Sequence, residues 1–214
     1  ADAVDIPIIV YNVPGRTGCN VELSTLAGVA EIRHIIGVKE ASGNMAQICE
    51  VCRSVPADFL VLSGDDAITL PVMSVGGRGV ISVAGHEVPG QMARLVELVE
   101  RNEWAAARAL HTRLLPLMTV NFVESNPMPV KAAMARLGLL SESFRLPMVP
   151  PRPLITWQAR QPFSSTSVLA RLISSAPSVL PAATGALPGA DWLLFSARLG
   201  LPPRLAREFG ARGA

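Results

Sequence analysis

The sequence predicts an α/β protein in which four parallel strands alternate with helices, and two observations carry that prediction. Short β-branched runs recur along the N-terminal part, each closed by turn residues and followed by a helical pattern. The expected strand ends at Tyr11, Lys39, Ser63 and Val83 are 28, 24 and 20 residues apart, which is the spacing of successive βα units. Such a succession forms a parallel sheet with helices packed outside it.

The first two strands are predicted at residues 6–11 and 35–39. The first run is almost continuously apolar, which is typical of a strand buried on both faces, and the turn residues at 12–18 end it. A helix is expected over residues 21–31. The second strand places Lys39 at its carboxyl end, and a Ser-Gly-Asn turn leads from there into a helix over residues 44–54.

The third and fourth strands are predicted at residues 59–62 and 79–83. A Ser-Gly-Asp-Asp turn closes the third strand, and a helix over residues 67–75 follows it. After the fourth strand, the loop at 84–87 leads to a helix over residues 88–101. That helix has the spacing i, i+3, i+4, i+7 of one apolar face, formed by Met92, Leu95, Val96 and Val99.

Beyond the four βα units the pattern is helical. One helix is predicted over residues 102–120, kinked at Pro116, and another over residues 130–137, ended by Gly138. Residues 151–214 contain eight prolines and no lysine. We therefore expect the βα units in residues 1–102, a helical extension in 103–150, and a weakly folded tail in 151–214 with helices near 167–174 and 203–209.

Composition narrows the classes of function. Residues 1–150 carry 12 basic and 15 acidic side chains, so this part is not expected to bind nucleic acid. No apolar run reaches the roughly 18 residues of a membrane span, and the first residues do not resemble a signal peptide. Three cysteines are too few for a disulfide framework, and reduced thiols fit a cytoplasmic protein.

Cys49 and Cys52 form a C-x-x-C pair inside the helix expected at 44–54. A structural zinc site would need further cysteine or histidine ligands. A redox pair would place its first cysteine at a helix N-terminus. We expect buried or half-buried free thiols and no metal site, and a thiol redox protein remains as an alternative.

Lys39 is the leading candidate for chemistry, because it is one of two lysines beside 17 arginines and lies at a strand end. Active sites of parallel α/β proteins form at the carboxyl ends of strands. One interpretation is a solvated surface lysine. The other is an amine nucleophile that forms a Schiff base with a carbonyl substrate, which requires burial that lowers a pKa of about 10.4.

Tyr11, Arg16, Gly64 and Ile81 also fall at or just after strand ends. A tyrosine hydroxyl can relay protons, and an arginine can hold a carboxylate through two parallel hydrogen bonds. The backbone carbonyls of Gly64 and Ile81 can accept hydrogen bonds from a substrate. Each residue has a plain alternative as part of a strand end or surface loop.

The other polar candidates are interpreted as structural. Asp65 and Asp66 are adjacent acids at the start of a helix, where carboxylates favour the helix N-terminus. His86 and His111 have no carboxylate or cysteine at metal-ligand spacing.

Five motifs occur in order along the chain: YNVPGRTG at 11–18, GVKEASGN at 37–44, LSGDD at 62–66, GVISV at 79–83 and NPMPVK at 126–131. Together they resemble the motifs of the dihydrodipicolinate synthase family. The resemblance covers about residues 5–150. It implies a Schiff-base lyase, a class I aldolase, on a TIM (β/α)₈ barrel with a C-terminal helical extension, usually a homotetramer.

The resemblance also assigns roles to the candidate residues. Lys39 resembles the lysine that forms an imine with pyruvate, and no other cofactor is implied. Tyr11 resembles the tyrosine that relays protons, and Arg16 resembles the arginine that meets the carboxylate of the second substrate, aspartate semialdehyde. Ile81 resembles a backbone contact to pyruvate, and Gly64 is predicted beside it as a substrate-binding position. The product would be 4-hydroxy-tetrahydrodipicolinate, in the diaminopimelate route of lysine biosynthesis.

The family pattern has four more βα units before those found here, so we expect the second half of a barrel plus the C-terminal helices. Three alternatives stay open. One is an N-acetylneuraminate lyase or sugar-acid aldolase of the same superfamily, which would share Lys39 and Tyr11. The second is a non-catalytic half-barrel that pairs with another half. The third is the thiol redox protein.

Overall fold

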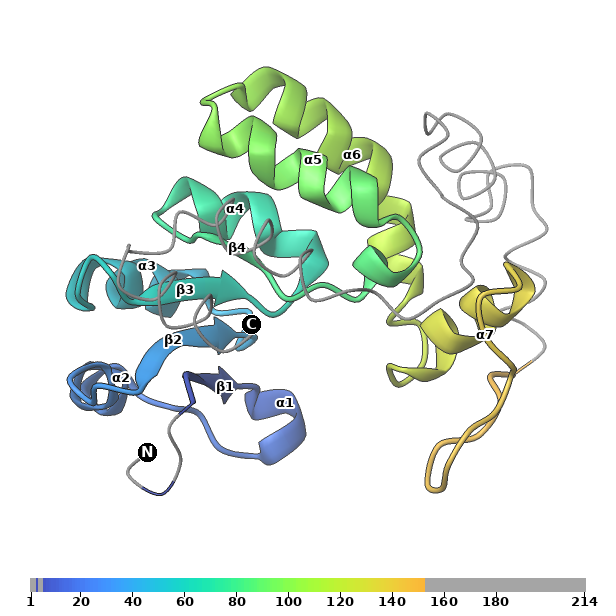
Figure 1. Ribbon diagram of the computed structural model, residues 1–214, viewed down its shortest axis with the longest axis horizontal. Helices are drawn as coiled ribbons and strands as arrows, with labels where there is room; N and C mark the ends of the chain where they lie inside the picture. The colour runs from blue at the N-terminus through green and yellow to red at the C-terminus, as the bar shows by residue number, and fades with distance from the viewer. Residues whose placement is uncertain (1–2, 4–5, 153–214) are drawn as a thin grey trace, which may run out of the picture.

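The computed structural model of the chain describes residues 3 and 6–152 (Figure 1). The predicted tail, including the helices expected near 167–174 and 203–209, lies outside the described residues except for its first two positions. Among the described residues, no helix is both long and apolar enough to cross a bilayer.

The described part is an α/β structure around one four-stranded parallel sheet in the order β1-β2-β3-β4, which confirms the predicted class. The strands are β1 (Ile8–Asn12), β2 (Ile35–Glu40), β3 (Leu60–Ser63) and β4 (Gly79–Val80). The helices are α1 (Pro14–Thr17), α2 (Leu23–Ala30), α3 (Met45–Ser54), η1 (Asp66–Ile68), α4 (Thr69–Ser74), η2 (Ala84–His86), α5 (Pro89–Glu100), α6 (Trp104–Val120) and α7 (Met128–Arg136).

One face of the sheet is covered by helices and forms a core. Val38 of β2 and Val61 of β3 pack with Leu26 of α2 and Val51 of α3, and Val10 of β1 lies against the same cluster. Because strand side chains alternate between faces, the neighbouring residues Tyr11, Lys39 and Leu62 belong to the opposite face.

A second core joins α4, α5 and α6, which Figure 1 shows packed beside one another above β4. The predicted apolar face of α5 is confirmed by the buried residues Met92, Leu95 and Val99. In α6, Ala107, Leu114 and Met118 are buried, and the helix continues past Pro116 to Val120. This core attaches the C-terminal helices to the sheet.

The first strand differs from the prediction that it is buried on both faces. Ile9 and Tyr11 are 38% and 46% exposed, because the described helices that pack on β1 lie on its Val10 side. A continuous apolar run therefore marked a strand correctly, but the second face is open. The fourth strand is also shorter than predicted, since pairing with β3 ends at Val80.

The C-x-x-C pair lies within α3, as predicted, but its burial is only partly as expected. Cys52 is half-buried, whereas Cys49 and Cys19 are exposed free thiols. Cys49 is exposed because the buried side of α3 is formed by Ile48 and Val51.

Gly37 marks the closest approach of β2 to β3. A Cβ there would be 2.5 Å from the Leu60 carbonyl oxygen and 2.8 Å from Leu60 Cβ. We predict that Gly37→Ala lowers the free energy of unfolding by about 1–3 kcal/mol, because backbone atoms must move apart. Gly28→Ala in α2 is the matched control, since its Cβ meets nothing within 4 Å and should stabilise by roughly 0.5–1 kcal/mol. Equal urea midpoints for the two variants would contradict this packing.

Candidate active site

Tyr11 and Lys39 lie side by side at the carboxyl ends of β1 and β2. The parallel register pairs Tyr11 with Lys39 and Lys39 with Leu62. The Lys39 ammonium nitrogen lies 4.3 Å from the centroid of the Tyr11 ring, within the range of a cation–π contact. The two side chains therefore lie on the same face of the sheet.

The surroundings of Lys39 favour the neutral amine. Partial burial lowers the pKa of Lys39 below its ordinary 10.5, and the positive charge of Arg16 acts in the same direction. The negative charge of Asp66 raises that pKa, but burial is the largest effect. A larger neutral fraction near pH 7 makes the amine a better nucleophile.

Gly64 gives the Lys39 side chain room to pass. A Cβ at Gly64 would lie 3.2 Å from Lys39 Cγ and 2.7 Å from Ala41 Cβ. The Gly64 N–H donates to the Glu40 carbonyl oxygen at 2.7 Å, which continues the sheet beyond β3. Gly64 therefore lies next to the predicted nucleophile, and its lack of a side chain has a steric reason.

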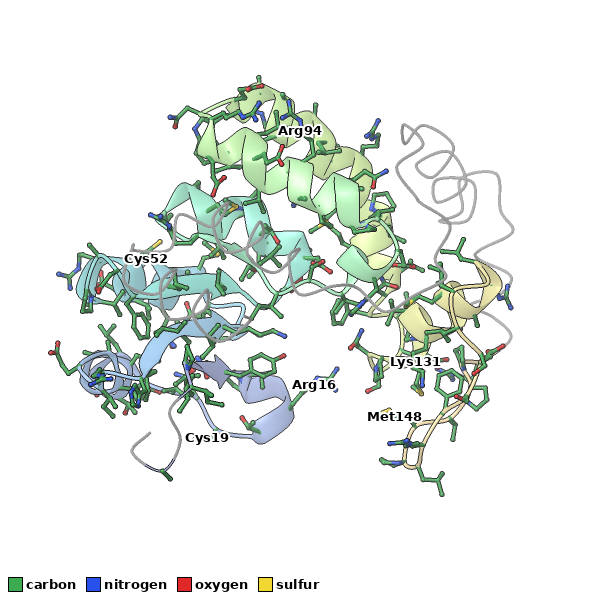
Figure 2. All side chains as sticks on the ribbon, in the orientation of Figure 1. Arg16, Cys19, Cys52, Arg94, Lys131 and Met148 are labelled. Atoms are coloured by element: carbon green, nitrogen blue, oxygen red, sulfur yellow. The ribbon has the colours of Figure 1, made fainter. Side chains whose placement is uncertain are left out.

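Arg16 projects from α1 towards the segment that precedes α7 (Figure 2). Its Nη2 donates to the Asn126 carbonyl oxygen at 3.2 Å, although the two residues are 110 positions apart. The guanidinium is exposed, and its charge acts on Lys39. The structure thus brings Arg16 within electrostatic reach of the amine, at the solvent-facing rim of the site.

Ile81 follows β4 and is 38% exposed. Its N–H donates to the Ser63 carbonyl oxygen at 2.9 Å, which fixes the backbone of Ile81 to the end of β3. Ser63 is itself the register partner of Glu40, one residue beyond Lys39. The predicted residues 11, 39, 64 and 81 therefore all lie at the carboxyl end of the sheet. Arg16 lies on the helix that follows β1.

The two adjacent acids have different roles. Asp65 Oδ1 accepts from the Ala67 N–H at 2.9 Å and caps η1, as predicted. Asp66 lies in the first turn of η1, where the prediction placed it, and its carboxylate has a further role. It is buried, and its Oδ2 accepts from the N–H groups of Val83 and Ala84 at 3.0 and 2.7 Å, so it holds the loop after β4.

The histidines of the sequence prediction are separate from this site. His111 Nε2 lies 2.9 Å from the Ala67 carbonyl oxygen, a structural contact between α6 and η1, and His86 is exposed. Within residues 3 and 6–152, no group of three or more His, Cys, Asp or Glu side chains could hold a metal ion.

A hollow of about 540 Å³ lies away from Lys39, beside α7. Its walls include Lys131 and Met148, which Figure 2 shows on the far side of the molecule from Cys52 and Cys19. The Lys131 ammonium donates to the Ser143 carbonyl oxygen and lies 5.0 Å from the Phe144 ring centroid. None of the predicted site residues lines this hollow.

The sequence analysis did not predict a buried polar network that lies beneath the site. Asn12 and Glu40 are fully buried register partners, and Asn12 Nδ2 donates to both Glu40 carboxylate oxygens at 3.2 and 3.1 Å. The Ser42 N–H donates to Glu40 Oε1 at 2.8 Å, and the Val21 N–H donates to Asn12 Oδ1 at 3.0 Å. Gln47 of α3 joins through Asn20.

This network fixes the Tyr11–Lys39 pair from the opposite face. Asn12 and Glu40 directly follow Tyr11 and Lys39 in the chain, so their bonds hold the two strands in register at that point. The sequence held one indication of this network, since a polar residue directly follows both Tyr11 and Lys39 at the strand ends.

The sequence analysis also did not predict the pair formed by Glu87 and Asn121. Asn121 Nδ2 donates to Glu87 Oε2 at 2.6 Å.

Comparisons with known proteins agree on one family. A model of the Dihydrodipicolinate synthetase family matches residues 1–159. The chain is 54% identical over 153 residues to the 4-hydroxy-tetrahydrodipicolinate synthase of Koribacter versatilis (strain Ellin345), a match that covers 72% of this chain and 51% of that relative. The chain therefore spans about half the length of the curated relatives it matches.

Solved structures give the same result. The 4-hydroxy-tetrahydrodipicolinate synthase of Methylacidiphilum fumariolicum SolV is 36% identical with a TM-score of 0.72, covering 81% of this chain and 55% of that chain. The chloride-inhibited dihydrodipicolinate synthase of Acinetobacter baumannii, solved in complex with pyruvate, is 31% identical with a TM-score of 0.71, covering 81% and 56%.

The network beneath the site predicts a stability difference between two glutamates. In Glu40→Gln an amide N–H₂ would face the Asn12 N–H₂ in place of a carboxylate oxygen. We expect the free energy of unfolding to fall by about 1–3 kcal/mol, because buried donors would lose their acceptor. Glu50→Gln is the control, since Glu50 makes an exposed ion pair with Arg53 and should change stability by less than about 1 kcal/mol. Similar losses in both variants, measured by urea unfolding, would rule out this role for Glu40.

Proposed function

The chain belongs to the dihydrodipicolinate synthetase family, and on that premise we propose that it is a Schiff-base lyase acting on pyruvate and aspartate semialdehyde. The product is 4-hydroxy-tetrahydrodipicolinate, in the diaminopimelate route of lysine biosynthesis in the cytoplasm. The observation that carries the proposal is Lys39, a partly buried amine with a lowered pKa beside the Tyr11 ring.

Chemistry at Lys39 begins with the neutral amine. Its nitrogen attacks the ketone carbon of pyruvate, the ketone oxygen leaves as water, and a protonated imine forms. The positive imine draws electrons from the neighbouring methyl group, so that a methyl proton is lost and an enamine results. The enamine carbon attacks the aldehyde carbon of aspartate semialdehyde, the aldehyde oxygen takes up a proton to become the hydroxyl group, and the imine is regenerated. The amino group of the bound product then displaces the Lys39 nitrogen from the imine carbon, which closes the ring of 4-hydroxy-tetrahydrodipicolinate and frees the amine.

The residues around Lys39 fit complementary roles. Tyr11, whose ring lies beside the Lys39 amine, would relay the protons that the amine and the ketone oxygen exchange. The exposed guanidinium of Arg16 suits the carboxylate of the aldehyde substrate. The backbone at Gly64 and Ile81, at the ends of β3 and β4, would contact bound pyruvate. No metal or prosthetic group takes part in this scheme.

We also propose that the described sheet is the second half of a (β/α)₈ barrel. The support is the order of four parallel strands with β1 and β4 at the two edges, and the coverage of about half of each relative. A closed barrel removes sheet edges and covers the face that carries Ile9 and Tyr11. Assembly into a homo-oligomer is part of the same proposal.

A non-catalytic half-barrel is the second candidate function. The exposure of Tyr11 and Ile9 favours it, because a site open to water on that face weakens every electrostatic effect on Lys39. Under this alternative, the residues of the site record the family's ancestry, and the chain does no chemistry alone.

Trapping of the imine tests the proposal. We predict that pyruvate with borohydride adds one reduced pyruvate to the full chain, located on Lys39 by peptide mass spectrometry, because borohydride reduces an imine to a stable amine. Lys39→Arg should abolish the adduct, while Lys131→Arg, the matched control in a chain with two lysines, should keep it.

Other results point elsewhere. Absence of labelling in the unmodified chain favours the non-catalytic half-barrel, and equal labelling of Lys131 would indicate unspecific reaction. In a turnover assay, aspartate semialdehyde should be consumed with pyruvate. Consumption of N-acetylmannosamine instead would reassign the chain to the N-acetylneuraminate lyases.

A further inference from the structure

Three buried polar side chains from separate segments form one cluster, in which Asn121 binds Glu87 and the charge of Asp66 acts on Glu87. Asp66 of η1 is 1% exposed, Glu87 between η2 and α5 is 6% exposed, and Asn121 at the end of α6 is 1% exposed. Asn121 Nδ2 donates to Glu87 Oε2 at 2.6 Å. The cluster is polar in a region otherwise formed by the apolar core of α4, α5 and α6.

Each of the two carboxyl groups uses one oxygen and leaves the other without a partner. Asp66 Oδ2 accepts from the backbone of Val83 and Ala84, whereas Asp66 Oδ1 and Glu87 Oε1 are buried and have no hydrogen-bond partner among the described residues. A buried polar atom without a partner costs about 1–3 kcal/mol. If both carboxyl groups were ionised, the repulsion between their charges would destabilise the folded state further.

One proton resolves both deficits. We propose that Glu87 is neutral in the folded protein and donates its carboxyl proton to Asp66, which makes Glu87 a positioning residue for the loop between β4 and η2. Glu87 Oε1 then carries the proton and Asp66 Oδ1 accepts it. Asn121 donates to the carbonyl oxygen of the neutral acid, and Asp66 Oδ2 continues to accept from the two backbone N–H groups.

The direction of ionisation agrees with this arrangement. Burial raises the pKa of Glu87 to about 7, and the charge of Asp66 raises it as well, against the hydrogen bond from Asn121. Several other charged or titratable groups lie on the packed elements. Arg94 of α5 pairs with Glu97 and Glu103, His111 of α6 contacts the Ala67 carbonyl, Lys131 of α7 binds the Ser143 carbonyl, and His86 of η2 is exposed.

The cluster is connected to the candidate active site through Asp66. The Asp66 carboxylate raises the pKa of Lys39 and holds Val83 and Ala84, which follow Ile81 by two and three residues. Loss of the proton from Glu87 would place a second negative charge beside Asp66 and weaken its hold on that loop. The consequence for imine formation rests on the proposed function, whereas the protonation of Glu87 does not.

The dependence of stability on pH tests the proton directly. A carboxyl whose pKa is raised on folding contributes stability that is fully present below about pH 4.5 and is lost as the pH rises to about 7. Glu87→Gln is neutral at every pH and keeps both a donor and an acceptor. We predict that the unfolding equilibrium constant of the unmodified chain rises relative to Glu87→Gln by roughly 80-fold between pH 4.5 and pH 7, measured by urea unfolding of the full chain.

Two further variants keep the test sharp. Glu100→Gln, at the exposed end of α5, should retain the pH dependence of the unmodified chain. Asp66→Asn removes the neighbouring charge, so the part of the pH dependence that Glu87 carries should move to lower pH. Parallel stability curves for the unmodified chain and Glu87→Gln would overturn the proposal, as would an Asp66→Asn variant in which the Glu87 part does not move.

Imine trapping separates this inference from the proposed function. At pH 6, Glu87→Gln should trap pyruvate on Lys39 at the level of the unmodified chain. Glu87→Ala should lose most of the trapping. If no variant traps pyruvate, the proposed function fails and the stability curves still decide the protonation of Glu87. Equal trapping by Glu87→Ala and Glu87→Gln would contradict the positioning role.

Discussion

The parallel register of β1, β2 and β3 is the constraint on which the candidate site depends. It puts Tyr11, Lys39 and Leu62 in one row across the sheet. A slip of one residue would turn Lys39 to the covered face, where Val38 and Val61 form the core. The bonds between Asn12 and Glu40 oppose such a slip, because they join the two strands one residue beyond the reactive pair.

The amine of Lys39 is balanced between opposing effects. Burial and the charge of Arg16 favour the neutral form, and Asp66 favours the charged form. Lys39 is only partly buried, so water still moderates these effects. A cover over the face that carries Tyr11 would strengthen the effect of burial, which connects the half-barrel proposal to the chemistry. Asp66 also orders the loop after β4 through its bonds to Val83 and Ala84. One side chain therefore both holds the backbone that follows Ile81 and contributes negative charge near Lys39.

Much of the architecture followed from periodicity and spacing. The βα units were predictable because each apolar run ends in turn residues, and the amphipathic face of α5 was readable from Met92, Leu95 and Val99. The candidates Tyr11, Lys39, Gly64 and Ile81 were found because parallel strands end at one edge. The openness of β1 was not predictable, since an apolar run does not show what covers each face. The partnerships of Glu40 with Asn12 and of Glu87 with Asn121 join residues 28 and 34 positions apart, and no local pattern contains them.

The fold partly buries Lys39 near the positive charge of Arg16, so that its amine loses a proton more easily than that of an ordinary lysine. A carbon-13 NMR titration of the lysine Cε signals measures this most directly, because the chain has two lysines and Lys131→Arg assigns the signal of Lys39. We predict that Lys39 titrates with a midpoint below 10.5, because burial lowers the pKa of its amine. A midpoint at or above 10.5 would contradict it.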